Sequence, residues 1–240
     1  MKIYFSRIVS VIALLIFINC SDKKEPLYKY QKPVDEKMDS TTSFLKDETN
    51  FLESNYEALF DSYYDKKIKE KDYKSAVKVL KIVATNAMRF QSYSSTFKDK
   101  LVFFSANYAR YITDKKMLSF LNLYLGKYYA DNRDYEVAIK YYLLGTKHDV
   151  NDFETCYSKA VNFRNIAWCY FCLGEQDLAI QNNLKALELL KMTDRKDLLG
   201  GVYFNLYPIY SATKDYKNAE ANLNKASYYF SLDKEKNLTN

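Results

Sequence analysis

The residues best suited to chemistry in this chain are its four cysteines and its single histidine. Cys169 and Cys172 have the C-x-x-C spacing of zinc and redox sites. A structural zinc site needs about four ligands, and the sequence has neither a second C-x-x-C nor a second histidine besides His148. We therefore expect no metal and no other cofactor. Cys156, Cys169 and Cys172 are expected to pack as small apolar side chains or, in an oxidising compartment, to form a disulfide.

The sequence also lacks the short motifs on which many catalytic sites depend. It contains no Gly-rich phosphate loop, no G-x-S-x-G turn and no H-E-x-x-H pair. Acidic pairs such as Asp134 with Glu136 stand at ordinary surface positions, where carboxylates are solvated. The sequence therefore predicts a protein that is not an enzyme.

A helix-hairpin pattern occurs four times and would position these side chains. Each copy carries an alanine nine residues after a position that is tyrosine in three copies and lysine in the first. Turn residues precede each second helix, for example Lys214-Asp215 before the last one. The alanines are Ala76, Ala138, Ala179 and Ala219, and the residues nine positions earlier are Lys67, Tyr129, Tyr170 and Tyr210.

This register resembles the tetratricopeptide repeat (TPR), whose template reads W-x2-L-G-x2-Y and then A-x3-F. The first template position is not tryptophan in any copy. The resemblance implies an all-α fold, a TPR-like α-solenoid of antiparallel helix hairpins in which small residues let helices approach closely. The best copies carry Asn122, Leu125, Gly126, Tyr129, Ala138 and Tyr142, and then Phe163, Ile166, Ala167, Tyr170, Ala179 and Asn183.

The spacing of the alanines predicts the domain organisation. The last two intervals are 41 and 40 residues, longer than the 34-residue repeat, so we place surplus residues in 146–154 and 192–199. The 62-residue interval before them leaves room for one more helix or a degenerate repeat. We expect a repeat domain at 40–232, with repeats at about 57–90, 119–152, 160–193 and 200–232, an extra helix at about 96–113, and a polar tail at 233–240.

Composition agrees with a single helical domain. Five glycines and three prolines in 240 residues are few, and a hydrophobic content of 48% is ample for a core. The formal charge of +6 comes from basic and acidic residues that are interspersed along the chain. Nucleic-acid binding requires clustered basic residues, so we expect no nucleic-acid partner.

The TPR resemblance implies a ligand site, because the first helices of stacked repeats line a concave surface. Trp168, the single tryptophan, falls on this surface beside aromatic residues of neighbouring helices, a combination that suits an aromatic-anchored peptide site. The alternative is that the chain's own termini fill the groove. The predicted groove residues are Phe120, Leu123, Lys127, Arg164, Asn165, Trp168, Phe171, Phe204, Asn205 and Pro208.

Three of these residues have particular expected roles. Asn165 and Asn205 occupy equivalent places where the family often hydrogen-bonds a ligand backbone. Pro208 lies within a first helix, cannot donate to the carbonyl of Phe204, and should kink the helix there. The Lys and Asn set of the family's carboxylate clamp is incomplete, so a C-terminal peptide ligand is not implied.

The N-terminus has the pattern of an export signal. Lys2 and Arg7 precede an apolar or small run at 8–18, which is too short to span a bilayer. The run ends at Asn19-Cys20, which resembles the lipobox of bacterial lipoproteins. That resemblance implies a signal peptide at 1–19, lipidation of Cys20 and membrane attachment, whereas an ordinary secreted protein and an uncleaved signal anchor are the alternatives. The polar residues 20–39 are predicted to form a flexible tether.

Together these features predict a membrane-anchored scaffold of the bacterial cell envelope that binds a protein or peptide in its groove. Ser21 follows Cys20 without the acidic residue that retains some lipoproteins in the inner membrane, which favours the outer membrane. One alternative is a sensory or regulatory component that acts through a separate output protein. Another is a structural subunit of an envelope complex whose convex face is the interface.

Overall fold

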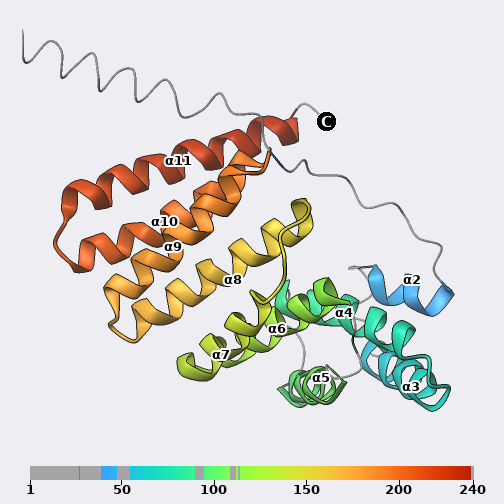
Figure 1. The fold of residues 1–240 in the computed structure, drawn as a ribbon. Coiled ribbons are helices and arrows are strands. Elements are labelled where there is room, and N and C mark those ends of the chain that lie inside the picture. Colours follow the sequence, from blue (N-terminus) through green and yellow to red (C-terminus); the bar gives the residue numbers. More distant parts are fainter. Residues whose placement is uncertain are drawn as a thin grey trace, which may run out of the picture.

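The computed structural model describes residues 39–47, 55–89, 95–108 and 114–238, together with Leu27 and Ile112. The predicted signal peptide, Cys20 and nearly all of the predicted tether lie outside these residues. Within the described part, ten α-helices follow one another (Figure 1). They are α2 (Ser40–Lys46), α3 (Tyr56–Lys69), α4 (Tyr73–Arg89), α5 (Ser95–Tyr108), α6 (Lys115–Asp131), α7 (Tyr135–Gly145), α8 (Phe153–Cys172), α9 (Gln176–Lys191), α10 (Leu199–Ala212) and α11 (Tyr216–Leu238), with a 3-10 turn η3 (Lys196–Leu198) before α10.

The helices form stacked antiparallel hairpins, so the predicted all-α, TPR-like solenoid is confirmed. The hairpins are α3/α4, α6/α7, α8/α9 and α10/α11, and each hairpin from α6 onward packs on its predecessor, as Figure 1 shows from green to red. The additional helix α5 packs between α4 and α6, and α2 packs on α3 and α4.

The first helices of the middle hairpins begin earlier than the repeat template suggests. The Asp114 carboxylate accepts hydrogen bonds from the amides of Lys116 and Met117, which starts α6 at Lys115. Asp152 and Thr155 form a capping box that starts α8 at Phe153. The surplus residues of these repeats are therefore divided between the connecting loop and an extra helical turn or more.

All four hairpin turns share one backbone motif. In the second hairpin, Arg133 has φ of 64°, its amide donates to the Ala130 carbonyl at 3.0 Å, and the Asp134 amide donates to Tyr129 at 2.9 Å. Asp134 then caps the next helix, and its carbonyl accepts from the amide of Ala138. Equivalent bonds surround Lys71, Gly174 and Lys214, which also have positive φ. This helix-terminating motif sets the nine-residue spacing that is visible in the sequence.

Small residues bring the paired helices together. A Cβ on Gly126 would lie 2.5 Å from the ring of Tyr142, so glycine is what allows α6 and α7 to approach. The four repeat alanines are buried at the equivalent place in the second helices. Three apolar clusters result, one within α2 to α6, one between α6 and α8, and one within α8 to α11.

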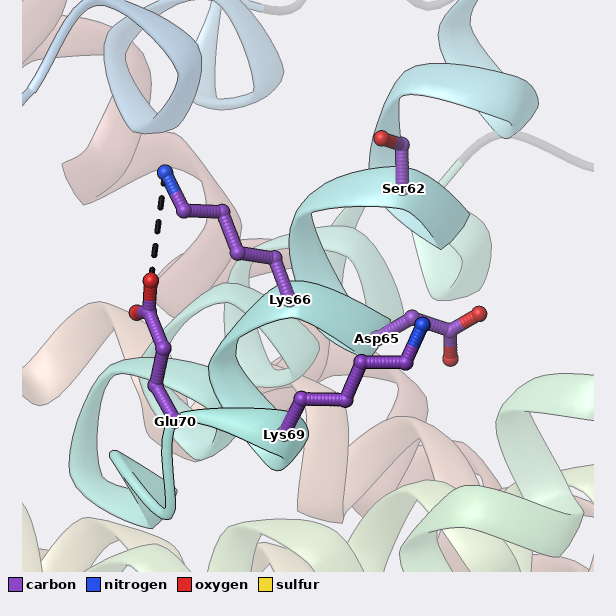
Figure 2. Close-up of a pocket in the computed structure, with 5 residues that line it drawn as sticks. All are labelled: Ser62, Asp65, Lys66, Lys69 and Glu70. Carbon is purple, nitrogen blue, oxygen red and sulfur yellow. Dashed lines mark ion pairs between the residues drawn. The ribbon is translucent and has the colours of Figure 1, made fainter.

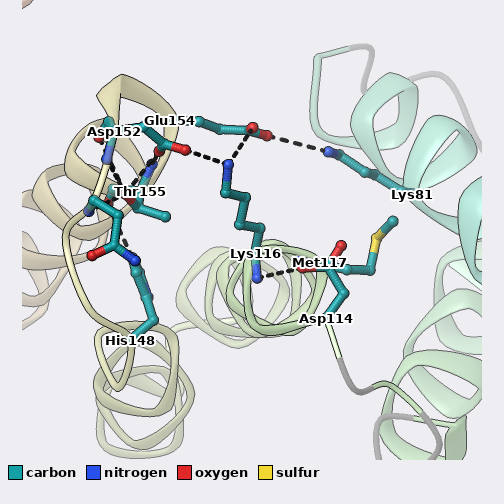
Figure 3. Close-up of polar contacts among 9 residues, drawn as sticks. Lys81, Asp114, Lys116, Met117, His148, Asp152, Glu154 and Thr155 are labelled. Atoms are coloured by element: carbon teal, nitrogen blue, oxygen red, sulfur yellow. Dashed lines mark hydrogen bonds and ion pairs between the residues drawn. The ribbon is translucent and has the colours of Figure 1, made fainter. Parts of the chain in front are cut away.

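A charged network joins the N-terminal hairpin to the middle of the array (Figure 3). The Glu154 carboxylate of α8 lies 3.8 Å from Lys81 of α4 and 3.5 Å from Lys116 of α6. Lys116 also contacts the Asp152 carboxylate at 2.5 Å. Partial burial would raise the pKa of Asp152, but hydrogen bonds from Lys116 and Thr155 outweigh it and lower the pKa to about 2. The network therefore ties α4, α6 and α8 together through charged side chains.

None of the helices in the described residues combines the length and the apolar content that crossing a membrane requires.

Candidate functional site

The first helices α6, α8 and α10 neighbour one another, as a TPR-type groove requires. α8 contacts both α6 and α10, although these helices are separated in the sequence by the second helices α7 and α9. The predicted groove residues therefore lie on adjacent helices. Their individual contacts decide which of them are available to a ligand.

An exposed aromatic pair lies on α8. The Trp168 side chain is 44% exposed although it is the largest apolar side chain in the protein, and Phe171 is partly exposed. The two ring centroids are 5.5 Å apart. This contact orients the indole while leaving much of it open to solvent, which is the state expected of an aromatic anchor before binding.

A second aromatic pair spans α10 and α11. Phe204 is 53% exposed, and its ring centroid lies 6.4 Å from that of Phe230, which is 45% exposed. Phe230 lies over Gly200, where a Cβ would come within 2.7 Å of its ring. Phe230 was not among the predicted groove residues, because it comes from a second helix and reaches the first helix only through this close approach.

Arg164 is the cation associated with these aromatic residues. It precedes Trp168 by one helical turn on α8, and a Cβ at Gly201 of α10 would lie 3.0 Å from its Nη1 atom. The Asn205 amide donates to the Arg164 carbonyl at 3.4 Å, which links the two helices. Within the described part of the chain the guanidinium forms no ion pair. Arg164 thus presents a partly buried positive charge next to exposed aromatic surface.

Several predicted groove residues make contacts within the protein instead. Phe120 packs on the N-terminal cluster, with the Lys81 ammonium 5.4 Å from its ring centroid. Leu123 packs in the cluster between α6 and α8. Lys127 pairs with Asp131 one turn along α6, at 2.9 Å. These three side chains therefore make contacts within the protein itself.

The remaining predicted residues are partly buried on α8 and α10. Asn165 lies near the side chain of Tyr142, whose pKa is raised chiefly by burial. Asn205 is engaged with Arg164 as described above. Pro208 lies inside α10, which continues as one helix on both sides of it. The exposed part of the predicted groove is therefore the surface of Arg164, Trp168, Phe171 and Phe204, with Phe230 added; we call this the aromatic surface.

Two of the three described cysteines, Cys156 and Cys169, are buried in the protein. Burial raises the pKa of the Cys169 thiol to about 12 and that of the Cys156 thiol to about 11, so both are protonated at neutral pH. Cys172 is exposed, and all three described cysteines are free thiols. His148 is buried, with Nε2 2.9 Å from the Thr155 carbonyl oxygen. In the described residues, no three or more His, Cys, Asp or Glu side chains are arranged to hold a metal ion.

Residues of α3 and the turn after it form a shallow depression (Figure 2). These residues are distant in the sequence from those of the aromatic surface. The depression is lined by Ser62, Asp65, Lys66, Lys69 and Glu70, and Figure 2 shows these side chains projecting from one helix and the turn that ends it. Lys66 and Glu70 form a long ion pair of 3.9 Å, and both are well exposed. Because no second element converges on the depression, we do not assign it a ligand.

No protein-family model matches the chain, and no curated protein matches it in sequence. Two solved structures are similar in outline. The crystal structure of BtubC (BKLC) from P. vanneervenii has 15% identity and a TM-score of 0.49, with 81% of this chain and 90% of that chain covered. MamA MSR-1 C2 has 14% identity and a TM-score of 0.47, with 75% and 99% covered. Similarity this distant carries no information about ligand or partner.

Proposed function

We propose that this protein is a non-catalytic scaffold that binds a protein or peptide on the aromatic surface of α8, α10 and α11. The observation that carries the proposal is the exposure of Trp168 and Phe204 on the adjacent first helices α8 and α10, together with the approach of the Arg164 guanidinium to Gly201 of α10. Exposed tryptophan and phenylalanine are costly in water and are typical binding hot spots. The two buried thiols with raised pKa, which cannot act as nucleophiles at neutral pH, fit a role in packing.

The chemistry of the surface indicates the chemistry of the partner. Arg164 has no ion pair in the described residues, so an incoming carboxylate would meet a guanidinium that is already partly desolvated. The flanking rings favour apolar or aromatic side chains. We therefore propose a partner segment in which an acidic residue stands next to apolar residues.

The binding test uses the full chain in its own membranes, with crosslinking followed by mass spectrometry. Trp168→Ala and Arg164→Gln should each reduce capture of the partner. The matched control is Leu143→Ala, which removes a similarly exposed apolar side chain from α7, outside the aromatic surface. Equal capture by all four proteins would reject the aromatic surface as the binding site.

We further propose that the scaffold is attached to the bacterial cell envelope through lipid on Cys20, at the outer membrane. The support is the sequence alone, namely the basic residues, the short apolar run and the cysteine that follows it. Cys20→Ser should abolish incorporation of a labelled fatty acid and move the protein from the membrane to the soluble fraction. Cys172→Ser, which removes an exposed cysteine of the repeat domain, is the control and should change neither result.

A further inference from the structure

Pro208 removes a backbone hydrogen bond from the middle of α10. In an α-helix each amide donates to the carbonyl four residues earlier, and proline has no amide hydrogen. Pro208 lies inside α10, which continues on both sides of it, so the Phe204 carbonyl lacks its helical donor. Among the described residues, no side chain takes the place of that donor. The Phe204 carbonyl oxygen is therefore an open acceptor within a continuous helix.

This acceptor lies on the same face of its helix as the aromatic surface. Counted back from the repeat alanines, Phe204 and Pro208 hold the places that Arg164 and Trp168 hold in the preceding repeat. The two first helices α8 and α10 pack side by side. Phe204 is 53% exposed, and the Arg164 guanidinium approaches Gly201, one turn earlier on α10. A segment that binds to the aromatic surface therefore passes over the open carbonyl.

A partner that covers Phe204 must supply a donor to this oxygen. Solvent satisfies an exposed carbonyl, but apolar contact with the Phe204 ring would exclude solvent from it. A carbonyl that is buried without a new donor opposes binding, because its hydrogen bond to water is lost and not replaced. The open acceptor therefore discriminates between partner segments that carry a free N–H at this point and those that do not.

The spacing between the open carbonyl and Arg164 indicates the conformation of such a segment. Gly201, which Arg164 approaches, precedes Phe204 by three residues, or about 5 Å along the helix axis. An extended peptide advances about 3.3 Å per residue, so the residue that meets Arg164 and the residue above the carbonyl are one or two positions apart. Backbone amides inside a helix are already bonded, whereas those of an extended segment are free to donate.

We propose that the partner segment binds in an extended conformation, with a backbone N–H donating to the Phe204 carbonyl and an acidic side chain pairing with Arg164 one or two residues away. This inference rests on the proposed binding of a peptide to the aromatic surface. Pro208 is then a specificity-determining residue, because it keeps the acceptor free. A helical segment has no free amide at this point and would bury the carbonyl without a donor.

The probe is the pentapeptide acetyl-Ala-Phe-Asp-Phe-Ala-amide, with four analogues that are each N-methylated at one of the four residues flanking its aspartate. N-methylation removes one backbone donor and retains the side chains. Trp168 is the only tryptophan of the chain and the peptides contain none, so its fluorescence reports binding at this surface. We expect one analogue to bind the purified full chain about five-fold more weakly than the unmethylated peptide.

Pro208→Ala restores the helical donor to the Phe204 carbonyl and should weaken binding of the unmethylated peptide several-fold. In this variant the sensitive analogue should bind as well as the unmethylated peptide, because the hydrogen bond that it cannot form is already lost. The matched control is Ser211→Ala, which removes the hydroxyl that donates to the Tyr207 carbonyl at 2.9 Å on the same helix. It should retain the difference between the two peptides.

Equal affinity of all five peptides for the parent chain would overturn the proposal. A penalty for methylation that persists in Pro208→Ala would also overturn it, since the proline would then act only through the shape of α10. Either result leaves the proposed function standing if Arg164→Gln still weakens binding of the unmethylated peptide. No response of Trp168 fluorescence to any of the five peptides would reject both proposals.

Discussion

At the scale of single residues, the close packing of the helices depends on glycines as much as on large side chains. Gly126, Gly145 and Gly200 each face a side chain of another helix at a distance that leaves no room for a Cβ. Their partners are the ring of Tyr142, the amide of Asn162 and the ring of Phe230. These contacts explain why small residues recur in the repeat pattern.

Gly126→Ala should lower the free energy of unfolding by about 1–3 kcal/mol, because the added methyl would overlap the buried Tyr142 ring. Thermal unfolding followed by circular dichroism measures the change. Gly201→Ala is the control, since its methyl would meet only the movable tip of Arg164. That variant should be neutral or gain up to about 1 kcal/mol from the better helix propensity of alanine. An equal loss in both variants would contradict the close-packing explanation.

The ion pair of Asp152 should make stability depend on pH in a defined window. Its pKa is lowered in the folded protein, so its contribution is complete above the unfolded pKa near 4 and is lost as the pH falls towards 2. Asp152→Asn keeps a residue that can cap α8 but removes the charge. Because the Asp152 side chain is 45% exposed, we expect the variant to lose less than about 1 kcal/mol at pH 7.

The measurement is the difference in melting temperature between the parent and Asp152→Asn at several pH values. The difference should be constant near neutrality and shrink between pH 4 and pH 2, as the parent loses its extra stabilisation. A difference that does not change across this window would show that the charge of Asp152 does not contribute.

At the scale of elements, the hairpin turns act as repeated units. Each turn ends one helix with a residue at positive φ and starts the next with a capping residue only one position later. Glycine occupies the positive-φ position in the third turn alone, at Gly174. The other three turns hold a lysine or an arginine in a conformation that favours glycine.

Arg133→Gly should therefore stabilise the protein by roughly 1 kcal/mol, because it relieves a left-handed backbone conformation at a solvent-exposed turn. Gly174→Arg makes the reverse change in the equivalent turn and should destabilise by a similar amount. Melting temperatures of the two single variants and of the double variant test the pair. The double variant should return close to the parent, since the turns are distinct and their effects should add.

At the scale of the whole molecule, stability is unevenly distributed along the array. α8 contacts four other helices and lies in the middle of the stack, whereas α2 is a seven-residue helix with two buried side chains. The ion pairs of Glu154 with Lys81 and Lys116 join α8 to α4 and α6 through exposed charges, which stabilise only weakly. The central hairpins should therefore be the last part to open.

Amide hydrogen exchange should show this order directly. Amides in the middle of α8 should exchange the slowest, with a free energy of opening close to the free energy of global unfolding. Amides of α2 should exchange much faster. Glu154→Gln should increase exchange in α4 more than in α10, because it removes the contact with Lys81. Uniform exchange along the array would indicate a single cooperative unit instead.

The sequence by itself determined the helical hairpins, the register of the four alanines and the position of Trp168 on a first helix. These features could be predicted because each hairpin turn consists of hydrogen bonds within about ten residues, and because helical periodicity is local. The sequence also predicted an exposed aromatic site, although it did not distinguish Trp168 and Phe204 from Phe120, Leu123 and Lys127.

Only the tertiary structure decided which of these side chains remain available. Phe120 and Lys127 are occupied by Lys81 and Asp131, while Phe230 reaches Phe204 because Gly200 lets two helices approach. Arg164 lies against Gly201 because α8 and α10 pack side by side, although α9 separates them in the sequence. Such contacts join residues far apart in the chain, and their formation depends on the summed packing of all the helices between them. Local pattern carries no record of that packing.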